Sequence, residues 1–221
     1  RFDNALVNLG HYLSDSKSDI TLYEGSHVKD LMLDLIASEP SAKVDHKIQC
    51  SSCTAIYRLD LIKQNKICFH SERELISEDL IFNLDYLKVS KKIAFNESKH
   101  YHYRLNNLSL TNTVRTDRVD KNLLLYNYIN ENLVDWNIDV QLGMERNQRL
   151  FIGNTRSSIC HFLSSSYINK KEWLNKVLSI SIWNELYNNY NWKKLPLFQR
   201  VFFFFCCKKC KWGLFLLSSL K

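Results

Sequence analysis

The sequence predicts an α/β protein in which helix predominates, with a mixed α/β part over residues 1–115 and an α-helical part after it. Three observations favour this class. The chain has 221 residues and a hydrophobic content of 45%, which is enough for a sizeable core. It has only 5 Gly and 2 Pro, too few for the many turns of an all-β protein. Short strand-like runs before residue 115 give way to long runs with helical spacing.

Strand and helix patterns alternate in the first part. SDITLYEG predicts a short strand, and HVKDLMLDLIAS has the apolar spacing of a helix. CTAIYRLDLIKQN predicts a short helix and KICF a short strand. From Ile76 to Leu87 the apolar positions again recur with a helix period, with Ser77 as the natural N-cap. KKIAFN and HYHYRL predict two further strands.

The second part divides into a helical region over residues 116–195 and a basic tail over 196–221. The helical region contains DKNLLLYNYINENLVDW, ERNQRLFIGNTRSSICHFLSSSYI and KKEWLNKVLSISIWNELYNNY, which all predict helices. From Leu186 onward there is no Asp or Glu, so the formal net charge of +7 lies entirely near the C-terminus. The apolar blocks of the tail are too short to span a bilayer. Its Phe, Leu, Trp and Lys content predicts an interfacial helix on an anionic membrane rather than nucleic-acid binding, and packing against the protein is an equal alternative.

Cysteine usage and the absence of a leader favour a cytoplasmic protein. The 7 Cys are odd in number and form no paired framework, which fits a reducing compartment. Cys50 and Cys53 have the spacing of a metal-binding pair, but no second pair follows at a suitable distance, so ordinary cysteines are favoured. Neither a signal peptide nor a spanning helix is predicted. The chain begins with Arg1, and we expect that its natural N-terminus lies further upstream.

The stretch SEDLIFN places two adjacent carboxylates, Glu78 and Asp79, at the start of a predicted helix. Carboxylates in the first turn are stabilised by about 0.3–1 kcal/mol each through the exposed N–H groups, so a simple helix start explains them. The same geometry also holds a carboxylate ionised and fixed, as a general base requires. Taken alone, the residues favour the helix start.

A second group of candidate residues is HYHYR. In a strand, His100, His102 and Arg104 share one face, which would carry two metal or phosphate ligands and a guanidinium suited to bidentate phosphate binding. The alternative is an edge strand whose polar residues face solvent. The residues alone favour that alternative.

Taken in order, these elements resemble a known family. SSCTAIYRLDLIKQNKICFHSERELISEDLIFNLDYLKVSKKIAFNESKHYHYRLNNLSLTNT is similar to the C-terminal half of the catalytic domain of bacterial glycosyltransferase family 2. The resemblance rests on a YR segment, a Glu-Asp-Leu with an aromatic residue soon after it, and a tyrosine-rich YHYR segment followed by Ser and Thr. It covers residues 45–115 well and residues 1–44 loosely.

The resemblance implies a GT-A fold and an inverting transfer of a sugar from a nucleotide sugar to a saccharide or lipid-linked acceptor in surface polysaccharide synthesis, such as capsule or O-antigen. It assigns Asp79 as the base that deprotonates the acceptor and Glu78 as its supporting neighbour. It makes His102, or less often His100, a metal ligand, and places His102 and Arg104 at the donor diphosphate. The implied cofactor is Mg²⁺ or Mn²⁺, and the implied location is the inner face of the cell membrane.

One departure from the family is large. Family members hold the metal and the nucleotide with an Asp-x-Asp motif, and this sequence has none. SDITLYEG resembles the stretch that follows that motif, so the nucleotide-binding half is expected upstream of this chain. We therefore expect the chain alone to be an inactive part of such an enzyme. The alternative is a non-catalytic helical module that binds a membrane surface or a partner through its basic tail.

Overall fold

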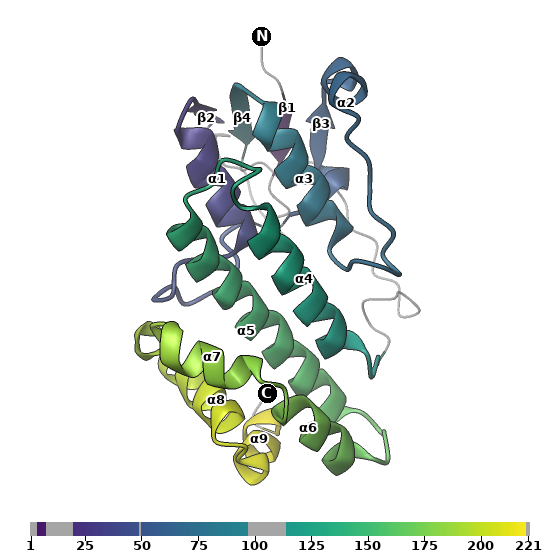
Figure 1. Cartoon of the computed structure of the whole chain (residues 1–221), viewed down its shortest axis with the longest axis vertical. Helices are drawn as coiled ribbons and strands as arrows, with labels where there is room; N and C mark the ends of the chain where they lie inside the picture. The colour runs from purple at the N-terminus through teal and green to yellow at the C-terminus, as the bar shows by residue number, and fades with distance from the viewer. Residues whose placement is uncertain (1–3, 8–19, 49, 97–113, 220–221) are drawn as a thin grey trace, which may run out of the picture.

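A computed structural model describes residues 4–7, 20–48, 50–96 and 114–219, and it shows a mixed α/β protein that is mostly helical (Figure 1). A four-stranded sheet lies at one end with the order β2-β4-β1-β3. Its strands are β1 (Asn4–Val7), β2 (Ile20–Glu24), β3 (Ala55–Tyr57) and β4 (Lys92–Asn96). β1 runs parallel to β4, and the other two pairs, β2 with β4 and β1 with β3, are antiparallel. The coarse prediction of an α/β class is therefore confirmed.

Helices α1 (His27–Ile36) and α3 (Glu78–Val89) build the first hydrophobic core beside the sheet. Both helices were predicted, as were the strands β2 and β4. The helical spacing of their apolar residues places one face of each helix toward Ile93 and Phe95 of β4. The fully buried members of this core include Leu31, Met32, Ile36, Ile81 and Leu84.

The stretch CTAIYRLDLIKQN does not form the single helix that its spacing predicted. It divides into a 3₁₀ turn, η1 (Ser52–Thr54), strand β3, and helix α2 (Leu59–Asn65). Strand β3 pairs with β1, and the ring of Tyr57 packs edge-on against Phe82 and Tyr86. These contacts between distant parts of the chain outweigh the local helical preference.

The predicted strand KICF (residues 66–69) is also wrong, because Lys66 lies in a turn and residues 67–69 have no regular structure. Phe69 from this segment stacks on Phe82 of α3, with ring centroids 4.1 Å apart. The apolar residues of KICF thus find partners on a helix surface rather than in the sheet.

The helical region forms α4 (Arg118–Asn132), α5 (Val140–Ser164), α6 (Lys170–Leu178) and α7 (Ile182–Asn189), followed by a 3₁₀ turn, η3 (Trp192–Lys194). The predicted helices are confirmed, with the third run divided between α6 and α7. Figure 1 shows α4 and α5 running side by side away from the sheet. Along α5, Leu150 belongs to the first core and Phe151 to the second core, which the later helices build. The two cores therefore meet along α4 and α5.

Buried ionic contacts hold the loop over residues 38–48 against α5. Arg149 has a fully buried side chain that donates to the carbonyl oxygen of Ala42 and pairs with Asp45 at 3.2 Å. Arg156 pairs with the same carboxylate. A Cβ at Gly153 would lie 2.9 Å from the Asp45 carboxyl carbon, so this close approach of loop and helix requires a glycine.

The basic tail forms α8 (Leu197–Cys207) and α9 (Lys211–Ser218), and both pack into the second core. The buried side chains of the tail include Phe202, Phe203, Cys206 and Leu214. Packing against the protein, one of the two predicted alternatives, is therefore observed for one side of each helix. Within the described residues, none of the helices has both the length and the apolar character needed to cross a bilayer.

Candidate functional site

The predicted base, Asp79, lies in the first turn of α3, which begins after a residue with unusual backbone geometry. Ser77 has φ 62° and ψ 42°, a left-handed conformation that costs a residue with a side chain about 1–2 kcal/mol. The Ser77 side chain makes no capping hydrogen bond, so its predicted cap function is not observed. Its carbonyl oxygen accepts instead from the backbone N–H of Leu80 at 2.9 Å. The chain thus turns sharply where the two carboxylates begin.

The carboxylate of Asp79 is held by a hydroxyl from a different element. The Ser52 Oγ of η1 donates to Asp79 Oδ1 at 2.5 Å, and the side chain of Asp79 is only half-buried. A hydrogen bond to the ionised form stabilises the charge, as does the N-terminal turn of the helix. Asp79 is therefore a fixed carboxylate that remains accessible on one side.

Behind Asp79 lies a network of half-buried polar groups centred on the buried Asn83, which is 1% exposed. The Asn83 amide donates to the Asp79 carbonyl oxygen at 2.7 Å and lies 3.2 Å from the Cys50 sulfur. The Asn83 carbonyl oxygen accepts from the Tyr57 hydroxyl at 2.9 Å. We call Ser52, Cys50, Tyr57, Asn83 and Asp79 the Asp79 network.

The two other titratable groups of the Asp79 network stay neutral. Burial, and next the nearby charge of Asp79, raise the pKa of Cys50 to about 12. Burial also raises the pKa of Tyr57 far above its ordinary value. Both groups therefore stay protonated near neutral pH, Tyr57 as a donor to Asn83 and Cys50 beside the Asp79 carbonyl oxygen.

The structure brings together only part of the predicted site. Glu78 follows Ser77 and precedes Asp79, and its carboxylate is half-buried with no ion pair or hydrogen bond to the described part of the chain. His100, His102 and Arg104 lie outside the described residues. Their predicted contacts with a diphosphate or metal remain predictions.

No metal centre is visible within the described ranges. Across residues 4–7, 20–48, 50–96 and 114–219, no group of three or more His, Cys, Asp or Glu side chains is placed to hold a metal ion. Cys50 faces the Asp79 network whereas Cys53 is exposed, so their CxxC spacing does not produce a shared site. The involvement of Mg²⁺ or Mn²⁺ stays a prediction.

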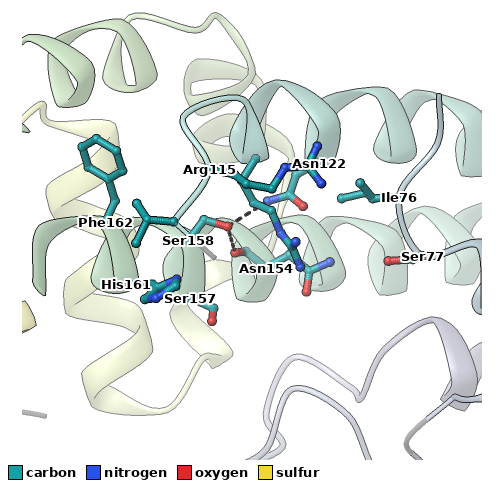
Figure 2. Close-up of a pocket in the computed structure, with 11 residues that line it drawn as sticks. Ile76, Ser77, Arg115, Asn122, Asn154, Ser157, Ser158, His161 and Phe162 are labelled. Atoms are coloured by element: carbon teal, nitrogen blue, oxygen red, sulfur yellow. Dashed lines mark hydrogen bonds between the residues drawn. The ribbon is translucent and has the colours of Figure 1, made fainter. Parts of the chain in front are cut away.

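A second candidate site is a pocket of about 330 Å³ between α4 and α5, close to the start of α3 (Figure 2). We call it the α4–α5 pocket. Figure 2 shows Ile76 and Ser77 at one end of the row of lining residues and Phe162 at the other. The lining consists of Ile76, Ser77, Val114, Arg115, Arg118, Asn122, Asn154, Ser157, Ser158, His161 and Phe162.

The lining of the α4–α5 pocket is basic and rich in hydrogen-bonding groups. Of the residues that the structure describes, two arginines and one histidine line it, and no Asp or Glu does. Asn154, Ser157, Ser158 and His161 have the spacing of one face of α5. The Asn122 amide of α4 donates across the interface to Ser158 Oγ at 3.4 Å, so the two helices are joined beside the pocket.

The two arginines of the pocket differ in their partners. Arg115 donates to both oxygens of Asp117, at 3.1 and 3.0 Å, and lies 3.8 Å from Glu72. Arg118 has no hydrogen bond or ion pair with the part of the chain that the structure describes. Its guanidinium is therefore not neutralised by a described carboxylate.

Sequence reasoning missed this pocket. The spacing of Arg118 with Asn122, and of Asn154 with Ser158, marks polar faces on two helices, but such faces usually point to solvent. Only the pairing of α4 with α5 turns the two faces toward a common space.

Comparison of the chain with known protein families finds no match, and comparison with curated proteins finds none either. The functional argument therefore depends on the residues and their geometry, together with the resemblance described above.

Proposed function

We propose that this chain is part of an inverting glycosyltransferase of the GT-A fold, in which Asp79 is the base that activates the acceptor. The observation that carries the proposal is the fixed carboxylate of Asp79, held at 2.5 Å by Ser52 in the first turn of α3. The left-handed Ser77 immediately before it supports the proposal, because strained backbone is concentrated at functional sites.

The proposed reaction is a direct displacement at the anomeric carbon of the donor sugar. The acceptor oxygen forms a new bond to that carbon, the bond to the nucleoside diphosphate breaks, and the acceptor proton passes to Asp79. A base for this step must be fixed and reachable from solvent, and the half-buried Asp79, held by Ser52, meets these requirements. Glu78 is proposed to orient the acceptor from the preceding position.

The donor side of the proposal derives from the family resemblance. His102 and Arg104 are proposed to meet the departing diphosphate, with Mg²⁺ or Mn²⁺ as the cation that neutralises it. The donor is a nucleotide sugar, and the acceptor is a saccharide or lipid-linked sugar of a surface polysaccharide.

Replacing Asp79 by Asn in the product of the whole reading frame tests the role of the base. We expect a loss of about 10²- to 10⁴-fold in the rate of nucleoside diphosphate release from a panel of nucleotide sugars, because proton transfer is lost. The matched control is Asp60→Asn, since Asp60 is also a first-turn carboxylate but lies exposed on α2 beside Arg58. The control should retain the wild-type rate.

Circular dichroism and urea midpoints of both variants establish that they are folded. A folded Asp79→Asn protein with an unchanged rate would overturn the assignment of the base. If the wild-type protein releases no nucleoside diphosphate from any nucleotide sugar, with or without Mg²⁺ or Mn²⁺, the proposed enzyme function is overturned. The alternative, a non-catalytic membrane-binding or partner-binding module, is then favoured.

We further propose that the tail helices contact an anionic membrane surface from the cytoplasmic side. Trp212 and Leu216 lie one turn apart on α9 and are 83% and 65% exposed, and Leu197 of α8 is exposed as well. Lys208 and Lys209 lie between the two helices and Lys211 is the first residue of α9, and the tail sequence contains no Asp or Glu. Exposed apolar groups flanked by lysines are the composition of a membrane-surface segment.

The double variant Trp212→Ala/Leu216→Ala tests this contact without disturbing the buried side of the tail. We expect binding to phosphatidylcholine vesicles that contain phosphatidylglycerol to fall about tenfold in a flotation assay, since these side chains would leave the interface. Leu59→Ala is the control, because Leu59 is 59% exposed on α2, at the opposite end of the molecule from α9 (Figure 1). Equal binding of both proteins, or binding that does not require phosphatidylglycerol, would remove the membrane claim.

A further inference from the structure

We propose that the α4–α5 pocket binds a phosphorylated saccharide, with the phosphate at the arginines and the sugar hydroxyls along α5. This assignment is carried by the pocket itself. The additional statement that the bound molecule is the acceptor rests on the proposed glycosyltransferase function.

The charge of the pocket selects an anion. Arg115 and Arg118 enter the lining from the chain just before α4 and from its first residue, and no carboxylate of the described residues lines the same space. Asp117 occupies one edge of Arg115 but leaves Arg118 without a partner in the described residues. A guanidinium presents several N–H donors in one plane, which suits the oxygens of a phosphate.

The remaining lining groups suit sugar hydroxyls. Asn154, Ser157 and Ser158 supply amide and hydroxyl groups that can both donate and accept hydrogen bonds. Figure 2 shows these side chains along α5, with Arg115 close to Asn154 and Ser158. The volume of about 330 Å³ is near the lower end of the roughly 300–1,000 Å³ seen for small-molecule sites. A small polar ligand therefore fits better than a large one.

The pocket is poorly suited to a nucleotide base. Phe162 is the aromatic residue of the lining, but its ring already stacks on Trp173 at 3.9 Å and packs on Tyr167 at 4.8 Å. Among the described lining residues the other ring is the exposed imidazole of His161, which offers a base little stacking surface, so a sugar phosphate is favoured over a nucleotide.

The pocket also adjoins the proposed catalytic residues along the chain. Ser77 lines the pocket and lies two positions before Asp79. If the chain acts as a glycosyltransferase, a phosphate-linked acceptor held here would be anchored next to the start of α3. The pocket then provides an acceptor anchor within the helical region.

Isothermal titration of the intact chain with glucose 1-phosphate tests the pocket, with glucose, inorganic phosphate and uridine diphosphate as the comparison probes. We expect glucose 1-phosphate to bind with millimolar affinity, several-fold tighter than inorganic phosphate, and free glucose not to bind measurably. Arg118→Met should weaken glucose 1-phosphate binding about tenfold or more, because a charge-assisted contact is removed. Arg200→Met is the matched control, since Arg200 lies on α8 outside the lining.

A second variant tests the proposed contacts between α5 and the sugar hydroxyls. Asn154→Ala/Ser157→Ala should remove the advantage of glucose 1-phosphate over inorganic phosphate while leaving phosphate binding unchanged. Retained affinity in Arg118→Met, equal losses in Arg200→Met, or tighter binding of uridine diphosphate would overturn the proposal.

The binding assay does not depend on turnover, so it separates the pocket from the proposed reaction. Asp79→Asn should bind glucose 1-phosphate as the wild-type chain does. Binding without any transferase activity would uphold the pocket and overturn the acceptor role, whereas activity without binding would overturn the pocket alone.

Discussion

The Asp79 network and the α4–α5 pocket are both polar, yet their side chains are satisfied in opposite ways. In the Asp79 network, Asn83 and Tyr57 bond to each other and Ser52 bonds to Asp79. In the pocket, Arg118 lines the space and has no hydrogen bond or ion pair with the described residues. The polar groups of the Asp79 network bond mainly to one another, whereas the α4–α5 pocket keeps donors available for a ligand.

This difference separates two ways of building a site. A closed network fixes one group in place before substrate arrives, and its members contribute to folding because each would otherwise be buried without a partner. An open pocket contributes little to folding and leaves its hydrogen-bonding capacity for the ligand. Changes in the Asp79 network should therefore alter stability and reactivity, whereas changes in the α4–α5 pocket should alter binding.

The largest effect that we expect concerns thiol reactivity in the closed network. Burial and the charge of Asp79 raise the pKa of Cys50 to about 12, so at pH 9 only about one Cys50 in a thousand is a thiolate. Cys53 and Cys68 are exposed and serve as internal references. Labelling by iodoacetamide, followed by peptide mass spectrometry, should modify Cys50 on the order of 10³-fold more slowly than either reference.

The raised pKa of Cys50 also predicts how folding stability and the labelling rate change with pH. Because the pKa of Cys50 is higher in the folded state, its neutral thiol favours folding below the ordinary value of 9.0, and this contribution is lost as the pH rises toward 12. The Cys50 labelling rate should rise about tenfold per pH unit in this interval while the protein stays folded. Equal rates for Cys50 and Cys53 at pH 9 would show that the network is open to solvent.

Sequence reasoning located the elements with strong periodicity and failed where distant contacts decide. The spacing of Leu31, Ile36 and Leu84 on α1 and α3 is a local property, and both helices appear where it placed them. Ala55–Tyr57 has no such local signal for a strand, because its structure depends on pairing with β1. The same limit explains the split of one predicted helix into η1, β3 and α2.

The candidate site was predictable only as far as its residues are neighbours in sequence. Glu78 and Asp79 could be singled out as an adjacent pair at a helix start. Their partner Ser52 lies 27 positions away from Asp79, and no pattern in the sequence links the two. The α4–α5 pocket combines faces of two helices with the segment before α3, so its existence follows only from their packing.

A smaller expected effect compares one asparagine from each site. Asn83→Ala should lower the free energy of unfolding by about 1–3 kcal/mol, because the buried Asn83 amide is lost and the half-buried Tyr57 hydroxyl loses its acceptor. Asn154→Ala is the matched change in the pocket and should cost less than about 0.5 kcal/mol, since that side chain has no partner among the described residues. Urea unfolding followed by tryptophan fluorescence measures both values, with m compared to confirm that the unfolding reaction is the same.

The comparison of the two unfolding free energies tests whether each site is closed or open. A cost for Asn154→Ala as large as that for Asn83→Ala would mean that the pocket is held together by its own polar groups, and its lining would then be structural rather than open for a ligand. A negligible cost for Asn83→Ala would mean that Tyr57 and Asp79 find other partners. In that case Asp79 would not be fixed by the residues around it, and its assignment as a preorganised base would lose its physical support.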